Sequence, residues 1–426
     1  MTTLVIGAAA SGRAATDLLR SQGDKVVVYD ANPDALDGIE ADVIRGGEWD
    51  PALLDGVDLV VPSPGVPEHA APIVAALDAG IPVWSELELG FRRIRVPIMA
   101  VTATNGKTTI AEVAAAMLEE SGLRSAAVGN IGVPLSAVDD SGLDVLVVEA
   151  SSFQLRFVET FHAEAAVLLN VAPDHLDWHR TMERYVTAKQ RILERQRPDD
   201  IVIFDTDDPG ATAAVTPAVS RRIPVSGTAA PVGGWGVSDG VLRVGGAEMP
   251  LAELARGDAA FVVDIAAAAA GALHLGAEPG AVEAAARHYR PQAHRRQVVG
   301  AWGGVTWVDD SKATNPHAAL AAIRAYPSVV LIAGGRDKGL DVRPLAMEPN
   351  LRAIVAIGEA APALVSASSR TLVASTLEEA VSMADDAARP GDTVLLAPGC
   401  ASFDMFTSYG DRGARFVAAV LQQKGA

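Results

Sequence analysis

The sequence predicts an α/β protein of three domains: a Rossmann-like N-terminal domain, a central α/β domain of the phosphate-loop type, and a Rossmann-like C-terminal domain. Three observations indicate this fold class. Short apolar runs that end in glycine or a carboxylate alternate with helical segments, as expected for parallel sheets covered by helices. Residues 103–109 have the composition of a phosphate-binding loop. The chain of 426 residues is also too long for one typical core.

The central domain is organised around residues 96–109. Ile98–Val101 is an apolar run of strand length, residues 102–107 are small and polar with one glycine, and helix formers follow from Thr108. Backbone N–H groups at such a helix start hold anionic oxygens, while Lys107 would reach the outer phosphates and Thr108 would bind Mg²⁺. Val101 stands where the common NTPase loop has a glycine, so this loop is a variant. An ordinary polar turn is the alternative.

The N-terminal part opens as a strand, a helix and a strand. Residues 3–7 form the first strand, the helix runs to about Ser21, and the strand 25–30 ends in Asp30. This pattern is typical of a dinucleotide-binding domain, although Ala9 replaces the glycine that lets a pyrophosphate approach closely. We expect further strands at 57–62 and 81–84. A domain boundary is predicted near residues 91–95.

Several polar residues of the central domain stand at strand ends. Glu149 closes the buried run 144–149, where NTPases commonly hold Mg²⁺. Asn130 lies in a glycine turn and is a candidate substrate contact. His175 follows the strand 165–171, and Lys189 lies on the helix after it; by pattern alone Lys189 would be an exposed helical residue. A strand at 200–204, hairpins within 226–250 and a helix over 258–275 complete the domain.

After a second boundary near residues 291–294, the chain repeats the strand-then-glycine design. Strands are predicted at 297–300, 304–309, 329–333, 352–358 and 392–398. Intervening helices make this a second doubly wound sheet with ligands at the carboxyl ends of its strands. Cys400 is interpreted as a buried small hydrophobic residue. As the single cysteine it allows no internal disulfide, which fits a reducing compartment.

Composition excludes some classes of function. The net charge of −18 argues against nucleic-acid binding, because phosphate backbones need a basic surface. The chain start carries no secretory signal, and the alanine-rich residues 259–275 are too weakly apolar to span a bilayer. We therefore expect a soluble cytoplasmic protein without nucleic-acid or membrane partners.

Motifs in all three parts resemble the Mur ligase family. Residues 104–109 match its Gly-Thr-Asn-Gly-Lys-Thr-Thr loop, with Ala103 in place of the first glycine. A second motif is matched by Asn170, Asp174, His175, Leu176, Asp177, Ala188 and Lys189. The run Asp310–Asn315 matches in full. The similarity covers essentially the whole chain and is greatest to the branch that adds D-glutamate to a UDP-sugar.

The resemblance implies an ADP-forming ligase. It would use ATP to phosphorylate the carboxylate of UDP-N-acetylmuramoyl-L-alanine and would then join D-glutamate through the acyl phosphate, in peptidoglycan synthesis for cell wall, shape and division. The implied domains are 1–92 for the UDP-sugar, 93–293 for ATP and 294–426 for the amino acid. The implied cofactors are ATP, two Mg²⁺ ions and a carbamylated Lys189. A monomer with small-molecule partners is expected.

The resemblance also implies a set of site residues. Catalytic roles are expected for Lys107, Lys312, His175 and Lys189. ATP would contact Thr104, Asn105, Gly106, Lys107, Thr108, Thr109, Arg295 and Asp310. Metal ligands would be Thr108, Glu149, His175 and Lys189. The UDP-sugar would contact Ala10, Ser11, Asp30, Asn32, Ser63, Gly65, Asn130, Ser151 and Gln154. D-glutamate would contact Thr314, Lys338, Ser402, Phe403 and Tyr409.

The chain departs from the family where the adenine is usually bound. Ala260 and Phe261 replace a His-Asn pair, and Asp264 stands where an asparagine is common. Adenine recognition is therefore expected to differ, without effect on the phosphate chemistry. Ser11 could equally be a helix-start residue without a ligand.

Other functions remain open at this point. They are a sibling ligase for another amino acid, a folylpolyglutamate synthase, an NAD-dependent oxidoreductase built on residues 7–30, and a non-catalytic nucleotide-binding regulator. Amino-acid-dependent release of ADP would distinguish them.

Overall fold

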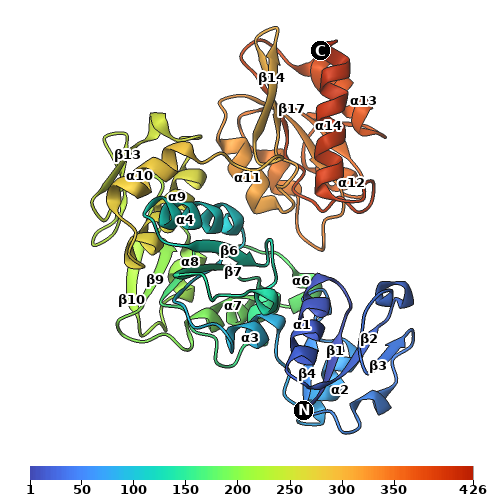
Figure 1. The fold of residues 1–426 in the computed structure, drawn as a ribbon. Coiled ribbons are helices and arrows are strands. Elements are labelled where there is room, and N and C mark those ends of the chain that lie inside the picture. The colour runs from blue at the N-terminus through green and yellow to red at the C-terminus, as the bar shows by residue number, and fades with distance from the viewer. Residues whose placement is uncertain (426) are drawn as a thin grey trace. The chain divides into compact units, whose positions relative to one another are not determined.

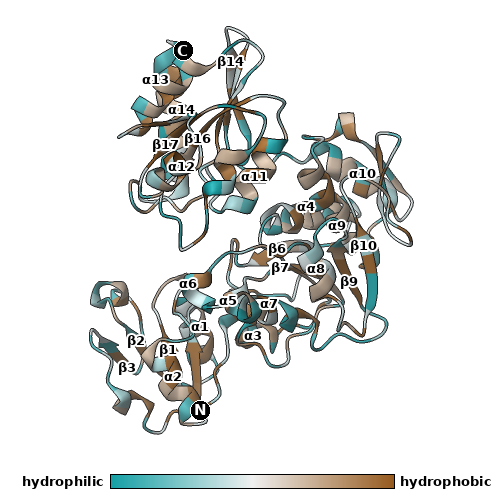
Figure 2. Ribbon diagram, turned by 180° about the vertical axis from the view of Figure 1, so that it is seen from behind, coloured by the Kyte–Doolittle hydropathy of each residue, from teal (hydrophilic) through white to brown (hydrophobic). Residues whose placement is uncertain are grey.

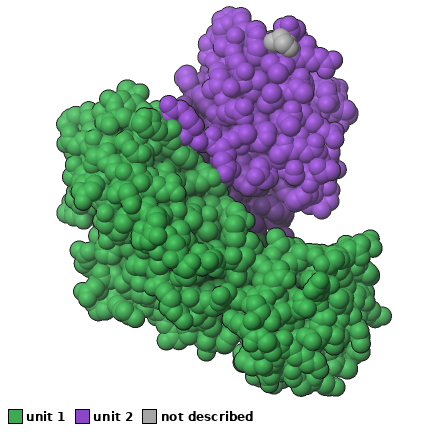
Figure 3. Space-filling view, viewed as in Figure 1, with its two compact units in different colours: residues 1–171, 178–289 green, residues 172–177, 290–426 purple. Residues whose placement is uncertain are grey.

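The structure is a computed structural model that describes residues 1–425. Figure 1 shows the fold of the chain, which divides into two compact units, coloured separately in Figure 3. Unit 1 contains residues 1–171 and 178–289, and unit 2 contains residues 172–177 together with the chain from Arg290 onward. The short segment 172–177 thus belongs to the C-terminal unit, although both of its chain neighbours belong to unit 1. The expected boundaries at 92/93 and 293/294 stay predictions.

Unit 1 begins with a parallel sheet in the order β3-β2-β1-β4. The alternation of strand and helix here gives the Rossmann-like arrangement expected from the sequence. The strong apolar character of β1 is visible as a brown arrow in Figure 2. The elements are β1 (Thr2–Ile6), α1 (Ala10–Ser21), β2 (Lys25–Asp30), β3 (Val43–Gly46), β4 (Leu59–Pro62), α2 (Ala71–Asp78) and α3 (Glu86–Phe91).

The strand expected at 81–84 is wrong. Only Val83 forms an isolated bridge, to Val60 of β4. Pro82 has no backbone N–H to donate, so the segment cannot continue a ladder at this position.

The central sheet of unit 1 is entirely parallel, in the order β10-β9-β8-β5-β7-β6. An antiparallel sheet, β11-β12-β13, follows where hairpins were expected. The strands are β5 (Ile98–Thr102), β6 (Ser125–Gly129), β7 (Val145–Glu149), β8 (Ala165–Leu168), β9 (Ile201–Asp205), β10 (Arg221–Val225), β11 (Gly236–Ser238), β12 (Val241–Val244) and β13 (Ala247–Pro250). The helices are α4 (Lys107–Glu120), α5 (Ser152–Leu155), α6 (Leu176–His179), α7 (Met182–Gln190), α8 (Pro209–Ala214), α9 (Ala259–His274) and α10 (Pro279–His288).

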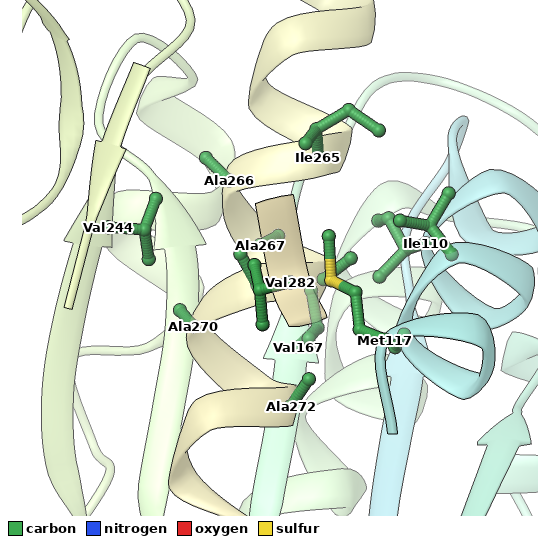
Figure 4. Close-up of a cluster of buried hydrophobic side chains, with 14 of the residues drawn as sticks. Ile110, Met117, Val167, Val244, Ile265, Ala266, Ala267, Ala270, Ala272 and Val282 are labelled. Atoms are coloured by element: carbon green, nitrogen blue, oxygen red, sulfur yellow. The ribbon is translucent and has the colours of Figure 1, made fainter. Parts of the chain in front are cut away.

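The alanine-rich helix α9 is buried beside α4 and β8. Figure 4 shows its alanines with Ile110 and Met117 of α4, Val167 of β8 and Val282 of α10. Small side chains let neighbouring elements approach closely: a Cβ atom added at Gly271 would lie 2.4 Å from Met99 Cε. The many alanines of this helix therefore allow it to pack tightly in the core.

The N-terminal sheet shares its core with residues of the central part. Leu4 and Ile6 belong to one hydrophobic cluster with Phe157 and Trp178. The buried Glu88 carboxylate also accepts hydrogen bonds from the backbone N–H groups of residues 159–161. These contacts explain why residues 1–171 form a single compact unit.

Unit 2 is built on a sheet in the order β14-β15-β19-β16-β17-β18, in which only β14 and β15 pair in antiparallel fashion among the described strands. Cys400 is fully buried, as expected, and burial raises the pKa of its thiol to about 12. The elements are β14 (Gln297–Trp302), β15 (Val305–Asp309), α11 (Pro316–Arg324), β16 (Val329–Gly334), β17 (Leu351–Ile357), α12 (Ala361–Ala367), β18 (Thr371–Val373), α13 (Leu377–Ala387), β19 (Thr393–Leu396) and α14 (Tyr409–Lys424).

Short 3₁₀ turns connect several elements of both units: Pro33–Leu36, Pro51–Leu54, Leu135–Ala137, Arg191–Leu193, Leu251–Glu253 and Arg343–Met347. Across residues 1–425 no helix combines the length and the apolarity needed to cross a lipid bilayer.

Candidate functional site

The predicted phosphate loop connects β5 to α4, as the sequence pattern indicated. Gly106 precedes α4 with φ of 93°, and a Cβ atom there would lie 2.2 Å from Asp264 Oδ1. Glycine is therefore required by both conformation and space. Ala103, which replaces the family's first glycine, is buried and is not among the residues with positive φ. The alanine therefore fits this position without backbone strain.

An asparagine after β8 fixes the shape of the loop. Asn170 Oδ1 accepts the backbone N–H of Asn105 at 2.9 Å, and Asn170 Nδ2 donates to the Asn105 carbonyl at 3.0 Å. The Asn170 carbonyl accepts the N–H of Thr104 at 3.0 Å, and the Thr104 hydroxyl lies 3.0 Å from the Tyr185 hydroxyl. These hydrogen bonds tie the loop to the segment after β8 and to α7.

The start of α4 offers backbone N–H donors and the Lys107 ammonium to an anion. Its first turn contains no acidic residue, and Thr108 and Thr109 are buried there. Lys107 Nζ donates to the carbonyls of Ala103 at 2.9 Å and Thr104 at 3.2 Å, so its charge lies directly over the loop. This is the arrangement expected for binding phosphate oxygens.

Glu149, at the end of β7, presents a carboxylate oxygen that lacks a hydrogen-bond donor. The side chain is 2% exposed, and Oε1 accepts Asn130 Nδ2 at 2.7 Å. Oε2 is buried and has no hydrogen-bond partner within residues 1–425. A buried anionic oxygen is costly unless a cation pairs with it, so this atom fits a Mg²⁺ ligand.

Lys189 is not the exposed residue that the helical pattern alone would give. It is 1% exposed, and its Nζ donates to the Ala103 carbonyl at 2.8 Å and lies 3.4 Å from Thr102 Oγ1. Nζ is also 4.7 Å from the centre of the Tyr185 ring. The structure therefore places this lysine against the predicted phosphate loop.

The remaining expected metal ligand, His175, lies in the segment 172–177 with φ of 54°. No group of three or more His, Cys, Asp or Glu side chains in the described chain is arranged to hold a metal ion. The expected set instead combines Glu149 with a hydroxyl, a lysine and a histidine from the segment in unit 2. It stays a prediction.

Residues expected to contact the UDP-sugar in the first sheet gather around the start of α1, where Ala10 and Ser11 lie. Asp30 Oδ2 accepts the N–H of Ala8, and Ser63 Oγ donates to the Gly7 carbonyl at 3.0 Å. These two side chains shape the loop in front of the helix. Asn32 and Gly65 are exposed, and Asn32 caps the turn that follows it.

Ser151 and Gln154 form hydrogen bonds with each other at the start of α5. The Gln154 amide oxygen accepts from Ser151 Oγ at 2.8 Å and from the Ser151 N–H at 3.0 Å, while Ser151 Oγ accepts the Gln154 N–H. Both side chains are buried. The structure therefore gives them a capping role, and their contact with the substrate stays a prediction.

In unit 2 most of the expected residues lie on loops after β15, β16 and β19, whereas Arg295 precedes β14 and Tyr409 begins α14. The Asp310 carboxylate accepts the N–H of Arg296, which is the neighbour of Arg295. Lys312 Nζ lies 3.9 Å from the centre of the Tyr409 ring. Ser402 is buried, whereas Phe403 is 66% exposed. Thr314 follows Lys312 on the same loop.

Lys338 occupies the left-handed region with φ of 55° and pairs with Asp174, Nζ to Oδ1, at 2.9 Å. Asn315 Nδ2 also donates to Asp174 at 2.9 Å. Burial opposes ionisation of Asp174, but His175, Lys338 and Asn315 together hold its pKa below the usual value. Sequence reasoning did not identify this cluster.

Arg412 was also missed by the sequence reasoning. This fully buried side chain donates to Ser311 Oγ and to the carbonyls of Ser311 and Cys400, which joins two of the loops. Burial lowers the pKa of Arg412 to about 10. An arginine in a helical pattern gives no signal of such burial. Asn170 was matched as a motif residue, but its role in holding the loop, like that of Tyr185, is visible only from its contacts.

Three family models match the chain: "Mur ligase MurD-like, N-terminal domain" over residues 1–85, "Mur ligase middle domain" over 101–227, and "Mur ligase, glutamate ligase domain" over 294–400. Two similar proteins are both named UDP-N-acetylmuramoylalanine--D-glutamate ligase. That of Frankia casuarinae is 42% identical, covering 99% of this chain and 94% of its own. That of Mycolicibacterium smegmatis is 38% identical, covering 99% and 97%.

Solved structures share the fold at low sequence identity. A pseudomurein peptide ligase type C from Methanothermus fervidus has a TM-score of 0.61 at 17% identity, covering 98% of this chain and 99% of its own. The MurF ligase from Thermotoga maritima, in complex with ADP, has a TM-score of 0.60 at 17% identity, covering 99% and 95%. The expected α/β fold class is confirmed.

Proposed function

The chain belongs to the Mur ligase family, and we propose that it joins D-glutamate to UDP-N-acetylmuramoyl-L-alanine at the expense of ATP, in the synthesis of peptidoglycan precursors. The observation that carries this proposal is the similarity to ligases named for that reaction, which extends over 97–99% of the chain at 36–42% identity.

The reaction first needs a better acyl donor than a carboxylate. A carboxylate oxygen of the L-alanyl group attacks the γ-phosphorus of ATP, the bond to the β-phosphate oxygen breaks, and ADP leaves. The amine of D-glutamate then attacks the acyl phosphate carbon and loses a proton. Inorganic phosphate departs with the electron pair of its C–O bond, and an amide remains. Catalysis of such a transfer depends on positioning and charge stabilisation.

The central domain would bind ATP through the loop Thr104–Thr109 and the start of α4. Lys107 would neutralise the outer phosphates. The hydrogen bonds from Asn170 would hold the loop in place, so that the loop need not reorganise during the reaction. From unit 2, Arg295 and Asp310 would contact the nucleotide, and Lys312 would stabilise the phosphoryl group in transfer.

Mur ligases in general require Mg²⁺, which supplies positive charge to the phosphate oxygens when bound. Glu149 and Thr108 would hold it, because Glu149 Oε2 is a buried anionic oxygen without a donor among the described residues. His175 and Lys189 are the further proposed ligands, and two ions are proposed.

Lys189 would serve as a ligand after carbamylation. Lys189 is buried, and a neutral lysine amine can attack CO₂ and release one proton to give an anionic carbamate. Intact mass measurement under CO₂, with Lys189→Ala as the control, would detect the added carboxylate. An unmodified mass under saturating CO₂ would contradict the proposal.

The substrates would bind at the two outer sheets. The start of α1, shaped by Asp30 and Ser63, would receive the diphosphate, since helix starts favour anions. Asn32, Gly65, Asn130, Ser151 and Gln154 are the further proposed contacts of the UDP-sugar. D-glutamate would bind through Thr314, Lys338, Ser402, Phe403 and Tyr409. We also propose that the protein acts as a monomer in the cytoplasm.

The test is ADP release in the presence of UDP-N-acetylmuramoyl-L-alanine, ATP and Mg²⁺. D-glutamate should support release, whereas L-alanine, meso-diaminopimelate and L-glutamate should not. Lys107→Ala should lower the rate by about 100-fold or more, because a charge-stabilising contact to the phosphates is lost. Release that is independent of D-glutamate, or unaffected by Lys107→Ala, would contradict the proposal.

A further inference from the structure

Asp174 is a buried carboxylate that unit 2 holds from two sides. The side chain is 4% exposed. Oδ1 accepts Lys338 Nζ and the N–H of His175, each at 2.9 Å, and Oδ2 accepts Asn315 Nδ2 at 2.9 Å. Each oxygen thus has a charged or polar donor, as a bound carboxylate ligand would have.

The two donor side chains are fixed independently of Asp174. Asn315 Oδ1 accepts the N–H of Ala318 at 2.9 Å as the N-cap of α11, so its amide nitrogen must face the other way, toward Asp174. Lys338 follows β16 on a loop anchored by backbone hydrogen bonds in both directions between Arg336 and Ala401. The amide and ammonium groups therefore form a prebuilt receptor for one carboxylate.

We propose that the Asp174 carboxylate occupies the place of a substrate carboxylate at Lys338, and that D-glutamate binds by displacing it with one of its own carboxylates. This inference rests on the proposed function, which places Lys338 in the D-glutamate site. Asp174 would therefore compete with the amino acid for Lys338 and help to determine the affinity of the protein for D-glutamate.

The charges explain why the two carboxylates compete. An ammonium has three donors, but a second carboxylate on Lys338 would face Asp174 at short range in a site that water scarcely reaches. Like charges in such a setting repel strongly, so Asp174 must leave or the amino acid must bind weakly. Neutralising position 174 removes this competition and leaves the receptor intact.

The experiment compares wild type, Asp174→Asn and a matched control, Asp341→Asn. Asp341 is exposed, lies three residues from Lys338 and pairs with Arg343, so its variant changes the net charge equally. Asp174→Asn should lower the KM for D-glutamate by roughly 3- to 10-fold and leave the KM for ATP unchanged. Calorimetric titration with D-glutamate should show the same gain. The control should match wild type.

Lys338→Met in the Asp174→Asn background tests the receptor without leaving a buried charge unpaired, and it should abolish the gain. A KM for D-glutamate that is unchanged or raised in Asp174→Asn, with a normal melting temperature, would overturn the exchange, because Asp174 would then only position Lys338. If Asp174→Asn fails to fold, Asp174→Ser serves as the second neutral variant. Absence of D-glutamate-dependent ADP release in wild type would instead overturn the proposed function, and the exchange with it.

Discussion

At the residue scale, the orphan oxygen of Glu149 gives the most direct test of the proposed metal site. Glu149→Gln preserves the shape and can still accept Asn130 Nδ2, but it removes the negative charge. Without that charge we expect ADP release to fall by about 100-fold or more, because the Mg²⁺ ligand is lost. The melting temperature without Mg²⁺ should stay the same or rise, since no buried charge needs compensation.

The measurement is ADP release over a Mg²⁺ series, together with thermal unfolding with and without the ion. A variant with wild-type Mg²⁺ dependence would show that Glu149 does not bind the metal.

Asp205, at the end of β9, should make stability depend on pH. Burial, reinforced by the charges of Asp207 and Asp208, raises its pKa to about 7. Because the folded-state pKa lies above the unfolded value of about 4, this group lowers the stability progressively as the pH rises from about 4 to 7, and the loss is complete above pH 7. Asp205→Asn should therefore be more stable than wild type at pH 8, by about 1–2 kcal/mol after allowance for partial exposure.

Thermal unfolding of both proteins at pH 5 and pH 8 checks this expectation. The advantage of Asp205→Asn should shrink at pH 5. An equal difference at both values would mean that Asp205 does not titrate in this range.

Individual residues could be predicted where the pattern that marks them lies in consecutive residues of the sequence. Gly106, Lys107 and Glu149 were predicted because a loop and a strand end are visible in consecutive residues. The burial of Lys189 and Arg412 was not predictable from helical pattern, because it depends on elements distant in the chain. Asn170 and Asp174 were matched as motif residues, but their hydrogen-bond partners could not be predicted because these lie far from them in sequence.

At the element scale, the strands that sequence reasoning missed are all at sheet edges: β3, β6, β10 and β18. An edge strand is covered less completely than a central one, so its residues need not form an apolar run. β3 and β18 are mostly exposed, and β10 begins with two exposed arginines. Central strands such as β5 and β7, buried at every residue, were all predicted.

The close packing of α9 predicts opposite effects of the same substitution in two helices. Gly271→Ala would bring a methyl group to 2.4 Å from Met99 Cε and should destabilise the protein by about 1–3 kcal/mol through overpacking. Gly280→Ala in α10, where a Cβ atom meets nothing within 4 Å, should stabilise by about 0.5–1 kcal/mol.

Chemical denaturation of the two variants measures this contrast, with Gly280→Ala as the control for helix propensity. If Gly271→Ala were stabilising as well, the core around Met99 would be looser than the structure indicates.

At the scale of the whole molecule, hydrophobic cores define the two units. Four core clusters consist of residues of unit 1 and two consist of residues of unit 2. Composition and repeated strand–helix patterns predicted three α/β domains. They did not predict that the first sheet shares its core with Phe157 and Trp178, because that cluster depends on tertiary packing alone.

Separate cores predict separate unfolding of the two units. We expect calorimetry to give a van't Hoff enthalpy below the calorimetric enthalpy, as in proteins whose parts unfold independently. ATP with Mg²⁺ should raise most strongly the transition of unit 1, which contains the predicted phosphate loop, since a ligand that binds only the folded state stabilises it by mass action. Lys107→Ala should remove this shift without altering the transition of unit 2. A single transition with equal enthalpies, moved as a whole by the nucleotide, would instead show that the two units fold as one cooperative body.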